Sequence, residues 1–336
     1  MAGDRPKRVT IYSIARECGV SASTVSRAFT RPEIVNDDVR EKIHAVARRL
    51  GYQPNKAARG LATGRAGMIG LLVPDITNPF FPPLVRSIQQ AASVADWSVL
   101  LVDADEVAAE ETELVEQVRS QVDGLIVASP RSTDADLETT LGDIPTVVIN
   151  RVVPGRPSVV CDNTTALTAA GQHLRELGHR RFALLKGPEA SWAARQRSEA
   201  IRQWAADAEV DLVESGDFAA SYDGGREASR AFLDSDATAA FAFDDLMACG
   251  VLAGLVEAGS SVPDDRSLVG CDDVLLARTV TPSLTTVTAP VGALGAAAID
   301  LLREAIGGEP ARELRLDGTL TLRASTGTVP VGAVRA

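Results

Sequence analysis

Two groups of side chains in this sequence have the types and spacing that specific recognition requires. The first group lies near the N-terminus, where Ser23 and Ser26 stand close to Arg27. A guanidinium pairs with guanine O6 and N7 through two hydrogen bonds, and hydroxyl groups bond to bases and phosphates. The second group consists of polar side chains that follow short apolar runs, among them Asp244 and Asp272. Because carboxylates and arginines bind hydroxyl groups by paired hydrogen bonds, the sequence predicts a nucleic-acid reader and a small-molecule site.

The N-terminal group divides by the kind of contact that each side chain can make. The candidates for base edges are Ala22, Ser23 and Arg27. An alanine methyl can touch thymine, whereas the other two can hydrogen-bond to bases. The candidates for phosphate contacts, which position a protein without reading sequence, are Thr10, Tyr12, Thr24 and Ser26. Taken alone, Arg27 has a plain alternative, that of a solvated surface arginine.

Charge is distributed unevenly along the 336 residues. The formal net charge is −11, yet residues 1–65 contain 13 Lys and Arg against 6 Asp and Glu. The remaining 271 residues contain the other 21 basic and 39 acidic side chains. A polyanion attracts the basic head and is repelled by the acidic body. We therefore expect a nucleic-acid-binding module on a body that binds something else, with a solvated basic tail as the alternative.

Composition narrows the class of protein. Apolar residues make up 45% of the chain and charged residues 24%, as in ordinary globular proteins. No apolar run is long enough to span a membrane, and the polar start MAGDRPKRVT does not resemble a secretory signal. The four cysteines are far apart, so we expect reduced thiols in a cytoplasmic protein rather than disulfides or zinc ligands.

The elements that must position the first group are three short helices. Apolar periodicity and capping residues predict helices over 11–18, 22–30 and 36–50. Ser21 is a good N-cap for the second helix, and Gly19 ends the first because it takes a left-handed conformation at no steric cost. A helix, a short glycine-containing turn and a second helix form a helix-turn-helix, whose second helix enters the major groove of DNA.

Residues 52–66 allow two interpretations. Pro54 blocks continuation of the third helix, Asn55 can cap a new one, and Gly60 weakens it. Leu61 would then be an exposed apolar residue at the end of a basic segment, of the kind that wedges between base pairs in the minor groove. Alternatively, Leu61 packs against the body and the segment is a plain linker.

From residue 67 onward, short apolar runs alternate with helical patterns, which indicates an α/β protein with parallel strands. The expected strands are 68–73, 98–102, 124–128, 146–149, 182–186, 239–243 and 267–270, with further strands within 311–328. The expected helices are 82–95, 108–120, 165–177, 193–206, 222–233, 245–258 and 291–306. Ligands of open α/β sheets bind at the carboxyl ends of the strands, so the polar residues there are the site candidates.

Two segments, VTIYSIARECGVSASTVSRAF and VREKIHAVARRLGYQPNKAARGLATGRAGMIGLLVPD, resemble the N-terminus of the LacI/GalR (lactose-repressor) family of bacterial transcription regulators. The resemblance implies a DNA-binding head over 1–52, a hinge over 53–66 and an effector-binding, dimerising body over 67–330. It also adds hinge residues to the DNA-binding candidates: Asn55, Lys56, Ala58 and Leu61.

The expected fold class is thus an all-α helix-turn-helix head joined to a two-lobed α/β body like the type I periplasmic binding proteins. In such a body the first lobe would comprise about 67–160 and 291–319, and the second about 161–290 and 320–330. Three crossovers would join them near 160–163, 286–291 and 318–323.

The resemblance also implies an effector cleft between the lobes. Its candidate residues are Asp75, Phe80, Arg151, Trp192, Arg197, Phe218, Asp244 and Asp272. Carboxylates, arginine and aromatic faces suit a sugar or sugar derivative, while a purine or another small anion stays open. Structural alternatives stay open too: an Arg197–Asp272 ion pair, helix caps at Asp75 and Asp244, and a core position for Phe218.

These observations predict a repressor that binds palindromic operator DNA as a homodimer and responds to a small effector. The C-terminal VPVGAVRA contains no heptad repeat, so we expect a dimer rather than a tetramer. The alternatives are a soluble sugar-binding receptor without a DNA function, or an enzyme. No phosphate loop, nucleophile elbow or metal-binding pattern is present, and we expect no catalytic residue, metal or cofactor. Two of the three histidines, His173 and His179, lie at an expected helix C-terminus, where a histidine caps carbonyl groups more often than it catalyses.

Overall fold

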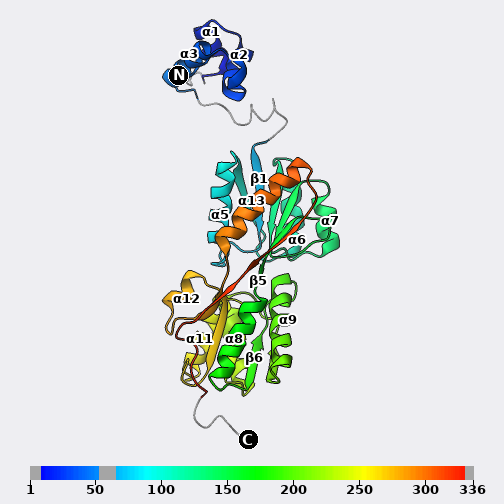
Figure 1. Cartoon of the computed structure of the whole chain (residues 1–336), viewed down its shortest axis with the longest axis vertical. Coiled ribbons are helices and arrows are strands. Elements are labelled where there is room, and N and C mark those ends of the chain that lie inside the picture. Colours follow the sequence, from blue (N-terminus) through cyan, green and yellow to red (C-terminus); the bar gives the residue numbers. More distant parts are fainter. Residues whose placement is uncertain (1–8, 53–65, 330–336) are drawn as a thin grey trace, which may run out of the picture. The chain divides into compact units, whose positions relative to one another are not determined.

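The computed structural model describes residues 9–52 and 66–329, and the chain divides into two compact units, Met1–Gly67 and Met68–Ala336. The first unit is the helical head and the second is an α/β body (Figure 1).

The described part of the head contains three α-helices and one turn of 3-10 helix. They are α1 (Ile11–Cys18), α2 (Ala22–Thr30), the 3-10 turn η1 (Pro32–Ile34) and α3 (Asp37–Arg49). The three helices confirm the ranges predicted from periodicity, whereas the 3-10 turn was not predicted. Ser21 caps α2 by accepting a hydrogen bond from the Thr24 amide at 3.0 Å. Gly19 ends α1 with φ +70°, a conformation that favours glycine.

The head has a small apolar core of its own. Ile14 of α1, Val25 of α2 and Ile43 of α3 are all fully buried in one cluster. Phe29 packs against this cluster, and its ring lies edge-on to that of His44 with the centroids 4.8 Å apart. The three helices therefore hold one another in place, and the exposed side of α2 is fixed by residues that face inward.

The body consists of two sheets. Over residues 66–329 each sheet has six strands, in the orders β11-β5-β4-β3-β1-β2 and β12-β10-β9-β8-β6-β7. Every pairing is parallel except that of β10 with β12. The strands are β1 (Met68–Val73), β2 (Ser98–Asp103), β3 (Gly124–Ala128), β4 (Thr146–Ile149), β5 (Ser158–Asp162), β6 (Arg181–Leu185), β7 (Asp211–Ser215), β8 (Ala239–Ala242), β9 (Ser267–Asp272), β10 (Thr285–Thr288), β11 (Glu313–Asp317) and β12 (Thr319–Thr321).

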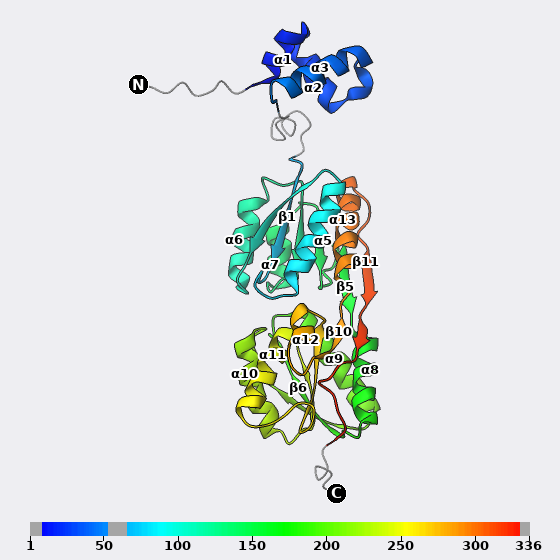
Figure 2. The same ribbon diagram turned by 90° about the vertical axis from the view of Figure 1, so that its left-hand side faces the viewer.

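Helices cover both faces of each sheet, as parallel strands require. They are α5 (Phe81–Val94), α6 (Ala108–Val118), α7 (Asp134–Leu141), α8 (Thr164–Glu176), α9 (Trp192–Asp207), α10 (Tyr222–Asp234), α11 (Asp245–Glu257), α12 (Leu275–Thr279) and α13 (Val291–Gly307). We call the sheet containing β1, with α5, α6, α7 and α13, the first lobe, and the sheet containing β6, with α8 to α12, the second lobe (Figure 2).

The chain passes between the lobes three times: after β5, after β10 and between β11 and β12. These crossovers place the carboxyl ends of the strands of both lobes around a shared cleft. The strands β5 and β11 run side by side and parallel at one edge of the first sheet (Figure 2).

Some elements of the body were not predicted. The expected strands omitted β5, β7 and β10, and the expected helices omitted α7 and α12. These elements are short or polar. For example, β7 is a partly exposed strand at the edge of its sheet, and the large apolar residues of α7 are only two leucines. Their structure depends on pairing and packing with distant residues, which periodicity alone does not reveal.

His179 does not cap the helix that precedes it. Its ring is buried, with Nδ1 lying 2.7 Å from Thr238 Oγ1 and Nε2 lying 3.0 Å from both Ser267 Oγ and the Gly327 carbonyl oxygen. The histidine therefore joins β8, β9 and the C-terminal segment, instead of capping the helix that precedes it.

Candidate functional site

The head presents several of the DNA-binding candidates on its surface. Arg27, Ser23, Thr10 and Tyr12 are exposed, and Tyr12 retains 70% of its accessible surface. The hydroxyl groups of Ser23 and Thr24 lie 2.7 and 2.8 Å from Ser21 Oγ, so they lie beside the N-terminus of α2. A helix N-terminus with its amides and hydroxyls suits a phosphate or base edge.

Other DNA-binding candidates of the head are less exposed or lie outside the described residues. Ala22 is half-buried against the head core. Ser26 is also half-buried, and its carbonyl oxygen accepts a hydrogen bond from Thr30 Oγ1 at 2.9 Å. The hinge candidates Asn55, Lys56, Ala58 and Leu61 lie outside the described residues.

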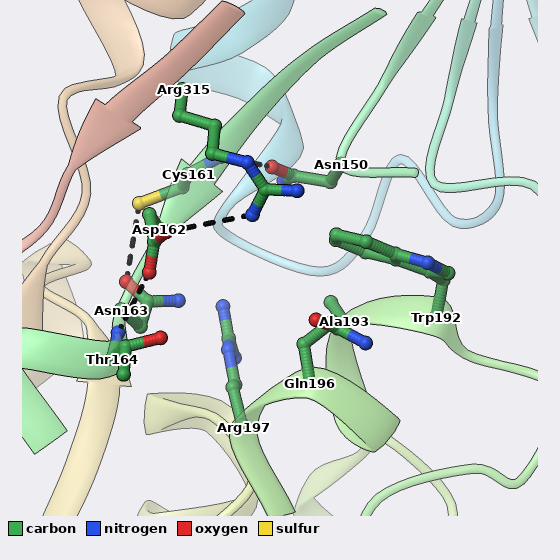
Figure 3. A pocket seen from close by; sticks show the side chains of 10 residues that line it. All are labelled: Asn150, Cys161, Asp162, Asn163, Thr164, Trp192, Ala193, Gln196, Arg197 and Arg315. Atoms are coloured by element: carbon green, nitrogen blue, oxygen red, sulfur yellow. Dashed lines mark hydrogen bonds and ion pairs between the residues drawn. The ribbon is translucent and has the colours of Figure 1, made fainter. Parts of the chain in front are cut away.

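Two adjacent cavities lie in the cleft of the body. The central cavity is lined by Asn78, Phe80, Phe81, Ser129, Arg131, Asn150, Ser191, Ala193, Arg197, Ala220, Phe243, Asp244 and Asp272. The crossover cavity is lined by Asn150, Cys161, Asp162, Asn163, Thr164, Trp192, Ala193, Gln196, Arg197 and Arg315 (Figure 3). Both lobes contribute to each cavity, and both cavities share Asn150, Ala193 and Arg197. A ligand there would contact both lobes.

Arg197 lies at the boundary of the two cavities. It projects from α9, and its guanidinium donates to the Phe243 carbonyl at 2.7 Å and to Asp272 Oδ1 at 2.5 Å. Burial acts to lower the pKa of Arg197, whereas the charge and hydrogen bond of Asp272, together with the neighbouring groups Cys271 and Cys161, raise it, so that the pKa lies above its ordinary value. The ion pair anticipated as an alternative is therefore present, and it lies within the second lobe. Arg197 Nε is buried and has no hydrogen-bond partner among the described residues.

Asp244 connects the lobes. One carboxylate oxygen caps α11 by accepting from the Met247 amide at 2.7 Å, and the other accepts from Asn78 Nδ2 of the first lobe at 3.1 Å. Only 2% of Asp244 is exposed. Burial, and then the charge of Asp272, raise the pKa of Asp244 to about 6. Asp244 is therefore both a helix cap and a lining group of the central cavity.

Aromatic side chains complete the walls. Phe80 is buried at the central cavity, and the indole of Trp192, at the start of α9, lines the crossover cavity opposite Arg315 (Figure 3). Phe243 lies below the guanidinium of Arg197, whose Cζ is 5.0 Å from the ring centroid. Rings in such positions offer flat apolar faces to the C–H groups of a ligand.

Three of the predicted effector residues line neither cavity. Asp75 Oδ1 accepts from the amide and hydroxyl of Thr77 at 2.7 and 2.6 Å, which makes it a turn residue. Arg151 is buried, and its guanidinium holds the carbonyls of Pro130 and Ser132 and the carboxylate of Asp134. Phe218 is half-buried against the core beneath α10 and α11. Local bonding and packing thus account for these three side chains.

The lining residues that were not among the predicted effector residues include Arg131, Gln196, Phe243 and Arg315. Phe243 is the last residue of the predicted strand 239–243 and directly follows β8, so the position rule for α/β sheets could have found it. Arg131 lies three residues beyond β3, and Arg315 lies inside β11; their positions depend on how loops and lobes pack, so no local pattern marks them.

The geometry defines a class of protein: a helical head of the helix-turn-helix type in one chain with a two-lobed α/β body that has cavities between its lobes. Sequence profiles agree, since "Bacterial regulatory proteins, lacI family" matches residues 10–55 and "Periplasmic binding protein-like domain" matches residues 171–326. The chain is 34% identical to the ribose operon repressor of Halalkalibacterium halodurans over 306 residues, 90% of this chain and 91% of the relative. It belongs to the LacI family of bacterial transcription regulators.

Solved structures support the same assignment. A lac repressor dimer bound to operator and the anti-inducer ONPF has a TM-score of 0.87 at 26% identity, covering 96% of this chain and all of that one. A LacI family regulator from Enterococcus faecium with bound ribose has a TM-score of 0.69 at 32% identity, covering 77% of this chain and 98% of that one. The predicted fold class, the resemblance to the LacI/GalR family and the predicted regulatory function are confirmed.

Two further observations concern other classes of protein. In residues 9–52 and 66–329, no helix is both long and apolar enough to cross a membrane. Over the same residues, no group of three His, Cys, Asp or Glu side chains is arranged to hold a metal ion. The relatives named above are transcription regulators rather than enzymes.

Proposed function

We propose that this protein is a cytoplasmic repressor that binds a palindromic operator as a homodimer and is controlled by a small polyhydroxylated effector in the cleft. The observation that carries this proposal is the central cavity, to which both lobes supply polar groups. A ligand that contacts both lobes favours one arrangement of the lobes over another, and this differential contact is what allosteric control requires.

The domain division follows from the same proposal. The head over 1–52 would read DNA, with Arg27 and Ser23 at base edges and Thr10, Tyr12, Thr24 and Ser26 near phosphates. Residues 53–66 would form the hinge, and 67–330 the effector-binding and dimerising body. Support comes from the exposed polar side of α2 and from the operator-bound dimer to which this chain is similar.

A sugar or sugar derivative suits the groups that line the cleft. Phe80, Trp192, Arg197, Asp244 and Asp272 are the effector residues that we retain, because each lines a cavity. The carboxylates accept hydrogen bonds from hydroxyls, the arginine donates them, and the rings cover apolar C–H faces. The similar structure with bound ribose and the ribose operon repressor favour a pentose as the first probe.

No described constellation supports catalysis, so we propose binding without turnover. A receptor without a DNA function is less well supported, because the head carries the lacI-family match and an exposed Arg27.

The test is selection of DNA by the purified full-length protein from a random duplex pool, at fixed salt near physiological. We expect an enriched sequence with two inverted half-sites. Parallel selections with and without ribose and a panel of other neutral sugars identify the effector by a change in enrichment. Absence of enrichment under every condition would contradict the proposal.

A further inference from the structure

The charged groups of the two cavities show which effectors the cleft can accept; this inference rests on the proposed function. The charged residues that line the cavities are Asp162, Arg131, Arg197, Asp244, Asp272 and Arg315. Arginines are the usual ligands for carboxylate and phosphate groups. The question is therefore whether any of these three arginines is free to receive an anion.

Arg131 is already neutralised in the first lobe. Its Nε and one terminal nitrogen donate to the two carboxylate oxygens of Glu106 at 2.6 and 2.8 Å, and its other terminal nitrogen donates to the Ser129 carbonyl at 2.7 Å. Glu106 is not a lining residue of either cavity. The guanidinium of Arg131 is therefore buried at the cavity wall, and its positive charge is neutralised by a carboxylate that lies outside the cavity.

The other two arginines also have carboxylate partners. Arg197 pairs with Asp272 at 2.5 Å, and both side chains are less than 10% exposed. Arg315 pairs with Glu313 at 2.6 Å and lies 3.5 Å from Asp162 across the first crossover (Figure 3). Each arginine of the cleft thus has at least one carboxylate of this chain beside it.

Asp244 is the remaining charged group, and none of these arginines pairs with it directly. Its hydrogen bonds come from an amide and from Asn78. With a pKa raised to about 6 by burial and by Asp272, it carries a negative charge at neutral pH and a proton in mild acid. When Glu106 and Glu313, the partners of Arg131 and Arg315, are counted with the lining residues, carboxylates outnumber arginines in both states of Asp244.

We infer that the cleft accepts an uncharged or cationic polyhydroxylated effector and rejects sugar acids and sugar phosphates, because every lining arginine is neutralised by this chain and Asp244 adds a further carboxylate. Bringing an anion into such a cavity removes its hydration without supplying a countercharge, which is costly.

The hydrogen-bonding groups agree with this inference. Arg197 Nε is a buried donor that no described residue satisfies, while Asp244 and Asp272 are acceptors at the same cavity. A hydroxyl group can accept from the first and donate to the others, whereas a carboxylate or phosphate can only accept. Adjacent hydroxyls on a neutral ring therefore match the cavity, and an added amino group would meet Asp244.

The experiment compares matched probes by calorimetric titration of the full chain. The probes are glucose, glucosamine and glucuronate, together with ribose and ribose 5-phosphate. We expect the anionic member of each set to bind at least about tenfold more weakly than the neutral one. Tighter binding of glucuronate or ribose 5-phosphate than of the neutral sugar would overturn the inference.

Two variants test whether the carboxylates of Glu106 and Asp244 cause the rejection of anions. Glu106→Gln leaves Arg131 without its carboxylate, and Asp244→Asn removes the additional one, so each should shift relative affinity toward the anionic probe. Asp134→Asn is the matched control, because Asp134 pairs with a buried arginine, Arg151, that lines neither cavity. An equal shift in the control, or no shift in Glu106→Gln and Asp244→Asn, would contradict the charge argument.

A measurement without an effector tests the charge of the cleft even if none of the sugar probes binds. Trp192 lines the crossover cavity, Trp204 is buried, and Trp97→Phe removes the third tryptophan, so fluorescence quenching in that background reports on the cleft. Glu106→Gln and Asp244→Asn should raise quenching by iodide relative to caesium, and Asp134→Asn should not. An unchanged ratio in both variants would refute the inference. Neither measurement uses DNA, so failure of the DNA selection would separately refute the proposed function.

Discussion

At the scale of single residues, Arg27 is the side chain on which base recognition most depends. It is exposed on α2, whereas Val25 and Ala28 of the same helix are buried and fix its direction. An arginine that pairs with guanine contributes discrimination between bases, and a phosphate contact does not.

We therefore expect Arg27→Ala to weaken binding to the selected operator by about 10- to 100-fold while affinity for random duplex changes little. Lys56→Ala, in the proposed hinge, removes a positive charge rather than a base contact, so it should weaken both alike and flatten the salt dependence. Fluorescence anisotropy with the two duplexes at several salt concentrations measures this. Equal losses on both duplexes for Arg27→Ala would remove its base-reading role.

Asp244 gives a prediction about pH. Its pKa in the folded protein is about 6, above the ordinary value of 3.8, so the folded state binds more protons than the unfolded state between these values. The contribution of this carboxyl group to the free energy of unfolding is therefore fully present below pH 4 and is lost as pH rises toward 6. Asn cannot titrate, so the free energy of unfolding of Asp244→Asn relative to wild type should rise by about 2–3 kcal/mol between pH 4 and pH 7.

Urea unfolding of both proteins across that range, compared as differences, measures the effect and cancels groups that they share. The direct loss of the carboxylate adds an offset that is independent of pH. A difference that stays constant with pH would mean that burial does not raise the pKa of this carboxyl group.

At the scale of elements, the head could be predicted well because its information is local. The N-cap at Ser21, the left-handed Gly19 and the apolar periodicity lie within the helices that they define. In the body, β7 and α7 carry weak local patterns and are stabilised by distant partners, so they were missed. The same limit applied at the cleft: Asp272 follows a predicted strand, but nothing near Arg131 in the sequence indicates Glu106 as its partner.

The cap of α2 can be tested directly. Ser21→Ala removes the oxygen that accepts from the Thr24 amide, which should destabilise the head by about 1 kcal/mol. Thermal unfolding of the head, followed by circular dichroism of the full chain, measures the loss. Ser23→Ala is the control, because its hydroxyl accepts no amide hydrogen bond within α2. Equal destabilisation by both changes would show that the cap is not the cause.

Helices α10 and α11 pack closely because two glycines face each other. A Cβ at Gly250 would lie only 2.0 Å from the Tyr222 carbonyl oxygen, and one at Gly225 only 2.0 Å from that of Met247. Gly250→Ala should therefore force the helices apart and destabilise the body by about 3 kcal/mol or more.

Gly307→Ala in α13 is the matched control, since nothing lies within 4 Å of its Cβ position. It should leave stability unchanged or raise it slightly, because alanine favours helix more than glycine does. Denaturant unfolding of both variants measures the contrast. Similar stabilities would contradict the close approach of α10 and α11.

At the scale of the whole molecule, the Asn78–Asp244 hydrogen bond joins residues from different lobes that are 166 positions apart. Both residues line the cavity where we place the effector. A ligand there either breaks this hydrogen bond or binds beside it. The hydrogen bond therefore contributes to the equilibrium between different arrangements of the two lobes. Binding at the cleft and binding of operator are then linked through that balance.

Asn78→Ala should therefore shift the effector concentration that gives a half-maximal change in operator binding by about fivefold or more, while affinity for random duplex is unchanged. Thr77→Ala is the control, because the Thr77 hydroxyl bonds only to Asp75 within its own loop. Anisotropy titrations with the selected operator and sugar measure the shift. Linkage also requires the effector to change operator affinity by the same factor as operator changes effector affinity, in wild type and variant alike. If Asn78→Ala and wild type give the same effector response, the hydrogen bond between the lobes takes no part in the coupling.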